Sequence, residues 1–256
     1  MGQEVELAEA LEAVATAYFD ADGMACDYDA LAASRERGRL AGCLLALDEL
    51  DPRKLTIPAQ TAFWLNLYNA LVLRDVLEMV LEDFFERERV RIAGHTWSLD
   101  DIEHGLLRGN APKYGRLRAP MRKGDPRLSF MPPAYDERMH FAMYTACRSS
   151  PALRAFHGEK LDAELEEATR RYLHANVRVK EEGARIRLPR VLQWYAADFG
   201  GERGVLEFVL ARLDDETVDM VDRRQGRVKL KYNDFDWSLN QKSGSEPHGT
   251  TLANPR

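Results

Sequence analysis

The sequence predicts an α+β fold in which helices predominate and a small, mostly antiparallel sheet completes the core. Three observations favour this class. Apolar residues recur at helical spacing over much of the N-terminal third, short alternating stretches occur at separate places further on, and strands do not alternate regularly with helices. The last observation argues against a doubly wound parallel sheet. A chain of 256 residues, 45% of them hydrophobic, is long enough to bury a full core.

Residues 1–50 are predicted to form a helical extension of the main domain. Residues 4–19 and 28–50 are rich in Ala and Leu, and Leu7, Leu11 and Val14 recur at helical spacing. We expect two amphipathic helices that lie on the core.

A long helix is predicted to follow the Asp51-Pro52 break. Pro58 is suited to the first turn of a helix, and the pattern continues to about residue 81. Residues 63–77 leave no fully polar face over the first turns. This helix should therefore be buried nearly all round.

A strand pair and a short helix come next in the prediction. Residues 89–97 alternate around Gly94, which is typical of a hairpin. Ser98 and Asp101 have the spacing of a capping box, so a helix should cover residues 99–108.

Residues 109–136 show no periodic pattern and hold five of the eleven prolines. A connection this long is usually a lid, a binding loop or a disordered segment. It leaves the predicted helix that carries Glu103 and returns into the predicted strand that carries His140, so we expect it to cover a site between them. Its basic residues could steer a carboxylate or phosphate, or could simply be solvated. They are Lys113, Arg116, Arg118, Arg122, Lys123 and Arg127.

The second half of the chain should supply the remaining strands and helices. Strands are predicted at 139–146, 177–188 (a hairpin) and 228–239, and helices at 161–175, 189–200 and 205–213. The main domain is expected to span 51–242. The tail, 243–256, is polar with Gly and Pro and is expected to be disordered.

Composition limits the function classes. A formal net charge of −6 does not suggest a protein that coats nucleic acid or an anionic membrane. Cys26, Cys43 and Cys147 are odd in number and scattered, so a reducing compartment is expected. The N-terminus is acidic and amphipathic, unlike a secretory signal, and no apolar run approaches the roughly 20 residues that span a bilayer. We therefore predict a cytoplasmic protein, and the sequence leaves its oligomeric state open.

Glu103 and His104 are the first candidates for chemistry. Glu103 should lie at the margin of the inward helix face, where a partly desolvated carboxylate can serve as a general acid or base, or can fix a neighbouring loop. His104 is in line with Asp100 and Arg108, which favours an exposed row of side chains. Alternatively, Glu103, His104 and His140 could hold a metal. The chain has no HExxH or other tight ligand spacing, and no metal is predicted.

A second group of candidates follows the predicted strand at 139–146. His140, Cys147 and the Ser149-Ser150-Pro151 turn are close in sequence. A helix starting at this turn could stabilise a thiolate or an oxyanion with its backbone amides. The simpler alternatives are a hydrogen-bonded core histidine and an inert buried cysteine.

Asn66 and Asn69 are unusual in a buried helix, three residues apart with Tyr68 between them. Buried amides require hydrogen-bond partners. They could clamp a loop or orient a histidine.

Seven segments resemble, in order, the domain of unknown function 547 family between about residues 57 and 240. They are AFWLNLYNALVL, WSLDDIEHGLLRGNAP, GDPRLSF, DERMHFAMYTACRSSPALRAF, LDAELEEATRRYL, LPRVLQWYAADFG and YNDFDWSLN. The resemblance implies a shared site built from Asn66, Asn69, Glu103, His104, Arg108, His140 and Ser150. Many relatives carry cysteine where this chain has Thr145, and bacterial ones often another at Ser150, whereas Cys147 occupies a position that is usually small. The family is also similar to papain- and transglutaminase-type enzymes in packing a helix on a small sheet.

Two functional hypotheses remain open. The first is acyl transfer or hydrolysis on a small amide, ester or thioester of a small-molecule or peptide substrate, without a cofactor. His140 or His104 would be the base, Glu103 the acid or orienting group, and Cys147 or Ser150 the nucleophile. Substrate would contact Asn66, Tyr68, Asn69, Arg108 and Ser149. The second is a non-catalytic binding module whose basic loop holds an anionic ligand or partner protein.

Overall fold

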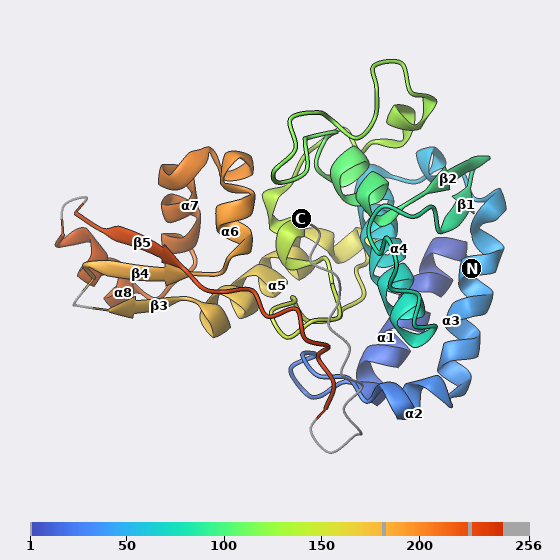
Figure 1. The fold of residues 1–256 in the computed structure, drawn as a ribbon, viewed down its shortest axis with the longest axis horizontal. Helices are drawn as coiled ribbons and strands as arrows, with labels where there is room; N and C mark the ends of the chain where they lie inside the picture. The colour runs from blue at the N-terminus through green and yellow to red at the C-terminus, as the bar shows by residue number, and fades with distance from the viewer. Residues whose placement is uncertain (1, 181–182, 225–226, 243–256) are drawn as a thin grey trace. The chain divides into compact units, whose positions relative to one another are not determined.

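A computed structural model describes residues 2–180, 183–224 and 227–242. Helices predominate and strands form two small sheets, so the α+β class is confirmed (Figure 1). Contacts divide the chain into two compact units. Unit 1 comprises residues 1–165 and 237–256, and unit 2 comprises Glu166–Asp236. The predicted domain boundary at residue 50 stays a prediction, and the predicted tail from residue 243 lies outside the described residues.

The N-terminal helices of unit 1 are α1 (Gln3–Tyr18), α2 (Tyr28–Ala32) and α3 (Arg35–Ala46), followed by the short 3-10 turns η1 (Leu47–Glu49) and η2 (Pro52–Lys54). The predicted helix at 28–50 is thus broken. Ser34 causes the break, because its hydroxyl accepts a hydrogen bond from the Arg37 amide and caps α3. Leu7, Leu11 and Val14 are fully buried, as helical spacing predicted.

Helix α4 (Ile57–Leu77) is the central element of unit 1. Every residue from Ala62 to Leu73 is buried, which confirms a helix buried all round. The Trp64 ring lies 4.9 Å from that of Trp97, which in turn lies 5.6 Å from Phe130. These rings fix the hairpin β1 (Val90–Ile92) and β2 (His95–Trp97) against α4.

The capping box after β2 is confirmed, since Ser98 and Asp101 exchange hydrogen bonds of 3.1 and 3.0 Å. The helix that follows, η3 (Asp101–Leu107), is a π-helix and not the α-helix expected. The Arg108 amide donates to the Glu103 carbonyl five residues back, at 2.8 Å. Such wide turns are rare and occur frequently at functional sites.

The strand predicted at 139–146 is wrong. After η4 (Pro126–Phe130), the 3-10 turn η5 (Glu137–Phe141) begins this segment, and a second turn, η6 (Gly158–Lys160), precedes α5. The side chain of Asn69 satisfies the backbone here, accepting from the Tyr144 amide and donating to the Ala142 carbonyl. The backbone groups that would pair with a neighbouring strand are thus satisfied by a side-chain amide.

Helix α5 (Leu161–Asn176) begins in unit 1 and continues into unit 2. The sheet of unit 2 consists of β3 (Arg178–Lys180), β4 (Arg185–Leu188) and β5 (Lys229–Tyr232), with β3–β4 antiparallel and β4–β5 parallel. Its helices are α6 (Val191–Trp194), η7 (Ala196–Phe199), α7 (Gly201–Leu210) and α8 (Asp215–Asp222). The predicted single sheet is therefore two separate sheets, and α8 was not predicted.

Candidate functional site

A largely buried polar cluster is centred on η3, and we call it the η3 cluster: Tyr68 of α4, Asp100, Glu103, His104 and Arg108. The Glu103 side chain is 10% exposed, and its Oε2 accepts a hydrogen bond from the Tyr68 hydroxyl of α4 at 3.1 Å. The buried helix α4 thereby orients the carboxylate of η3.

His104 is held in one tautomer by its neighbours. Its Nδ1 lies 3.1 Å from the Arg108 guanidinium, which can only donate, so Nδ1 must accept. The ring proton is then on Nε2, which lies 3.6 Å from Asp100 Oδ1. Glu103 Oε1, at 3.6 Å from Nδ1, is beyond direct hydrogen-bond range.

His104 is neutral at physiological pH. Burial lowers its pKa from 6.5 to about 3, and the positive charges of Arg108 and Lys113 act in the same direction. Asp100 opposes this effect, but less strongly than burial. His104 can therefore act as a fixed dipole and hydrogen-bond donor, not as a cation.

The row formed by Asp100, His104 and Arg108 exists, but the expectation that it would be exposed is wrong. His104 is 1% exposed and Arg108 is 6% exposed. Arg108 also donates to the Pro112 carbonyl at 2.9 Å, and Lys113 Nζ contacts Asp100 at 2.7 Å. Burial raises the pKa of the Asp100 carboxyl.

The segment 109–136 contacts the η3 cluster near its start, through Pro112 and Lys113. That it covers a site stays a prediction. Met121 lies against Gly105, where a Cβ atom would stand 2.5 Å from its terminal carbon. The Tyr135 hydroxyl lies 3.5 Å from His140 Nε2. His140 itself is 3% exposed on η5 and is close enough to His104 to lower the pKa of that ring further.

Asn66 and Asn69 clamp the loops on either side of the candidate turn, which was one of the two roles expected. Asn66 exchanges hydrogen bonds of 2.7 and 2.9 Å with the backbone of Phe156. Asn69 spans Ala142 and Tyr144 at 3.0 and 2.8 Å. Each side-chain amide thus forms the pair of backbone hydrogen bonds that a neighbouring strand would otherwise form.

The predicted nucleophiles lie together on the segment 145–150, which we call the Cys147 turn. Cys147 is fully buried and its Sγ lies 3.2 Å from Thr145 Oγ1. Ser150 is 1% exposed, and its hydroxyl accepts from the Thr145 amide at 2.8 Å and donates to the Pro151 carbonyl at 2.8 Å. No helix begins at the Ser149-Ser150-Pro151 turn, so the oxyanion donors expected there are not provided by a helix N-terminus.

Sequence reasoning missed some residues of this region. Gly105 lies against Met121, and Tyr135 lies against His140. A glycine inside a helical pattern is a signal that could have identified Gly105. A network formed by Tyr28, Tyr144 and Asn240 was also missed. The two tyrosine hydroxyls lie 2.6 Å apart, and each lies within hydrogen-bond distance of the Asn240 side-chain oxygen Oδ1. Burial raises the pKa of both tyrosines.

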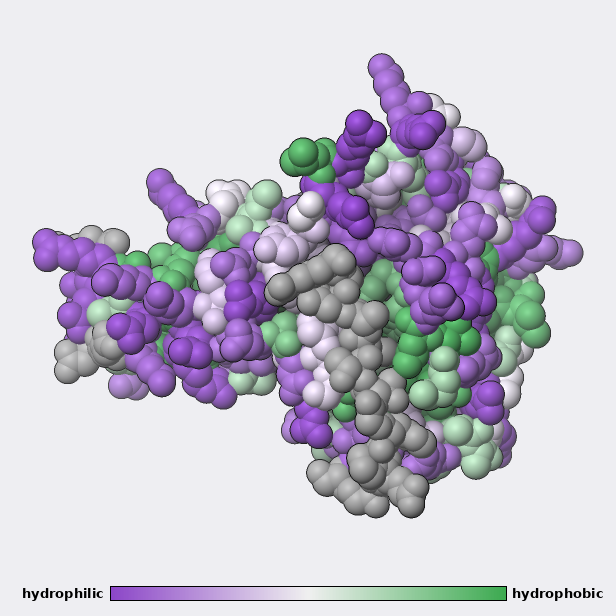
Figure 2. All heavy atoms as spheres, viewed as in Figure 1, coloured by the Kyte–Doolittle hydropathy of each residue, from purple (hydrophilic) through white to green (hydrophobic). Residues whose placement is uncertain are grey.

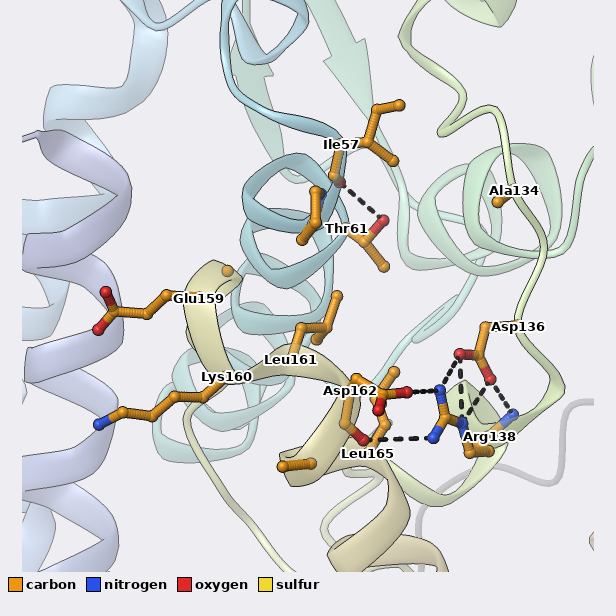
Figure 3. A pocket seen from close by; sticks show the side chains of 13 residues that line it. Ile57, Thr61, Ala134, Asp136, Arg138, Glu159, Lys160, Leu161, Asp162 and Leu165 are labelled. Carbon is orange, nitrogen blue, oxygen red and sulfur yellow. Dashed lines mark hydrogen bonds and ion pairs between the residues drawn. The ribbon is translucent and has the colours of Figure 1, made fainter.

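A groove of about 500 Å³ lies on unit 1 between the first turn of α4 and the segment 158–165. Its lining includes none of the predicted site residues. Arg138 lies in it between Asp136 and Asp162, at 2.7 Å from each (Figure 3). The arginine charge is thus balanced by two carboxylates, which argues against an anion site here. Among the described residues, no group of three or more His, Cys, Asp or Glu is placed to hold a metal ion.

The fold and site define an α+β domain with a buried, hydrogen-bonded acid–base cluster. Residues 52–173 match the family model described as "Protein of unknown function, DUF547", and the chain therefore contains a domain of this family. The match includes the η3 cluster and the Cys147 turn, whereas the resembling segments from residue 189 onward lie outside it. No curated protein and no solved structure matches the chain.

Proposed function

We propose that the η3 cluster is an acid–base site and that the protein hydrolyses or transfers the acyl group of a small amide, ester or thioester. One observation carries this proposal. A carboxylate, Glu103, and a neutral imidazole, His104, are fixed side by side on a π-helix by Tyr68 and Arg108. Fixed, partly desolvated acid–base groups are what such a reaction requires.

In this proposal Glu103 moves the proton. It takes a proton from the attacking water or acyl acceptor as the new bond to the acyl carbon forms, and returns it to the leaving group as the old bond breaks. His104 stays neutral and stabilises negative charge by hydrogen bonding, and His140 assists as a second imidazole. Tyr68 and Arg108 position these groups.

The nucleophile in the proposal is water or an acceptor molecule, and neither Cys147 nor Ser150. The Ser150 hydroxyl already accepts from one backbone amide and donates to one carbonyl, and Cys147 is fully buried. Asn66 and Asn69 are engaged with backbone, so they support the site instead of contacting substrate. Ser149 as a substrate contact, a papain- or transglutaminase-like architecture and a cytoplasmic location stay predictions.

To test the proposal, the rate at which the full chain hydrolyses p-nitrophenyl acetate, an acetyl thioester and an acetanilide is measured. Glu103→Gln keeps the shape and an acceptor for Tyr68 but removes the proton acceptor. We expect it to lower kcat/KM about 100-fold or more for the substrate that turns over. Cys147→Ala should stay within about twofold of wild type.

Glu167→Gln is the matched control, because Glu167 is exposed and lies in unit 2. Equal activity of Glu103→Gln and the control would overturn the role of Glu103. Loss of activity in Cys147→Ala, with the fold intact, would restore the cysteine as nucleophile.

The binding-module hypothesis is the second candidate, and one observation favours it. Arg118, Arg122 and Lys123 are exposed and form no ion pair within the described part of the chain. Binding of an anionic ligand by this segment would not require any chemistry at Glu103.

A further inference from the structure

Positive charge is concentrated in one surface segment. Residues 111–124 contain five basic and no acidic residues, although the whole chain carries a formal charge of −6. The net charge predicts no general attraction to an anionic surface. This segment is therefore a local exception.

The segment is a closed loop held at its base. The Asn110 side chain exchanges hydrogen bonds with the Met121 backbone, 3.0 Å in each direction. Met121 is buried against Gly105, and Lys113 is tied to Asp100. The path of the loop is thus fixed before it meets any partner, which lowers the entropic cost of binding.

The tip of the loop is presented to solvent. All residues from 114 to 120 are exposed. Leu117, between two arginines, is 99% exposed, and Tyr114 is 51% exposed. Figure 1 shows this green segment projecting beyond η3, and Figure 2 shows hydrophilic side chains projecting over the same edge.

The cations of the loop are available for a partner. Arg118, Arg122 and Lys123 form no ion pair among the described residues. Arg116 has one weak exposed contact, 3.7 Å from Glu86. A projecting leucine with flanking arginines combines an apolar side chain that can insert with charges that can bind phosphate.

We propose that this basic loop, residues 113–123, docks on an anionic lipid surface. An acidic protein fits less well, because a stable protein interface involves roughly 20–30 residues a side, more than this loop contains. A bilayer requires no such area, since each basic residue adds to binding independently. The inference does not rest on the chemistry proposed for Glu103, and its readout is different.

The test is sedimentation of the full chain with vesicles of phosphatidylcholine alone or with 30% phosphatidylserine, at low and high salt. We expect binding only to the anionic vesicles, weakened by salt. The variant Arg118→Gln/Arg122→Gln/Lys123→Gln should bind roughly 100-fold more weakly, at about fivefold per charge. Leu117→Ser should weaken binding about tenfold without changing charge.

The control is Arg37→Gln/Lys54→Gln/Lys180→Gln, which removes the same charge from exposed positions elsewhere. Weakening by the control equal to that of the loop variant would overturn the proposal. Failure of wild type to bind anionic vesicles, or equal binding to neutral ones, would do so too. Binding to polyglutamate but not to vesicles would assign the loop to an acidic polypeptide instead.

Discussion

The η3 cluster and the Cys147 turn differ in what their polar side chains contact. In the η3 cluster, Tyr68 contacts the Glu103 carboxylate and Arg108 contacts the His104 ring, although Arg108 also donates to the Pro112 carbonyl. In the Cys147 turn, Ser150 holds backbone, through the Thr145 amide and the Pro151 carbonyl. Both regions are buried.

This difference separates candidate chemistry from folding. A hydroxyl that satisfies a backbone amide and a backbone carbonyl cannot leave them without a cost of about 1–3 kcal/mol for the stranded group. The Glu103 carboxylate is instead oriented by another side chain, the Tyr68 hydroxyl. We therefore interpret Ser150 as structural, and the proposal places the working groups on η3.

The largest predicted difference is in thiol reactivity. In native protein treated with iodoacetamide, Cys43, which is partly exposed, should react first. Cys26 and Cys147 are fully buried and should react only when the protein unfolds. Their reaction should be at least about a thousandfold slower than that of Cys43. Peptide mass spectrometry would follow each cysteine. In urea all three should react alike, and rapid native labelling of Cys147 would show that the turn presents a reactive thiol.

The next prediction concerns the acid sensitivity of His104. Its pKa is about 3 in the folded protein and near 6.5 in the unfolded chain, so the unfolded chain binds the proton more readily. The contribution of this group to the free energy of unfolding is fully present above about pH 6.5 and is lost as the pH falls towards 3. Between pH 6.5 and 5 the loss should be about 2 kcal/mol in the free energy of urea unfolding.

Replacing His104 should remove this part of the pH dependence. His104→Gln should show a shallower slope over the same interval, whatever its absolute stability. His174→Gln is the control, since His174 is exposed on α5. The same slope in His104→Gln and wild type would mean that His104 is not held neutral by its surroundings.

Much of the fold could be predicted because its signals are local. Helix α4 follows from a run without a polar face, and the cap of η3 from Ser98 and Asp101. The sequence could not show that residues 139–146 are not a strand. Alternating apolar residues also occur in a segment whose backbone forms hydrogen bonds with the side-chain amide of a residue distant in sequence. The partner of that segment, Asn69, is more than seventy residues away in sequence.

The sequence named Tyr68, Glu103, His104 and Arg108 as candidates, but it did not give their arrangement. An α-helical periodicity places His104 on an exposed row, whereas His104 is buried on a π-helix in the structure. The contact between Gly105 and Met121 depends on chain packing that no local pattern encodes. Which hydroxyl is engaged with backbone is likewise a property of the folded chain.

The comparison between the two regions is tested most directly by measuring activity per folded molecule and urea stability together, in Glu103→Gln and Ser150→Ala. We predict opposite outcomes. Glu103→Gln should lose acyl hydrolysis about 100-fold while its stability stays within about 1 kcal/mol of wild type. Ser150→Ala should lose about 1–3 kcal/mol of stability while its folded fraction keeps wild-type activity. Full stability with lost activity in Ser150→Ala, or full activity in Glu103→Gln, would contradict the account.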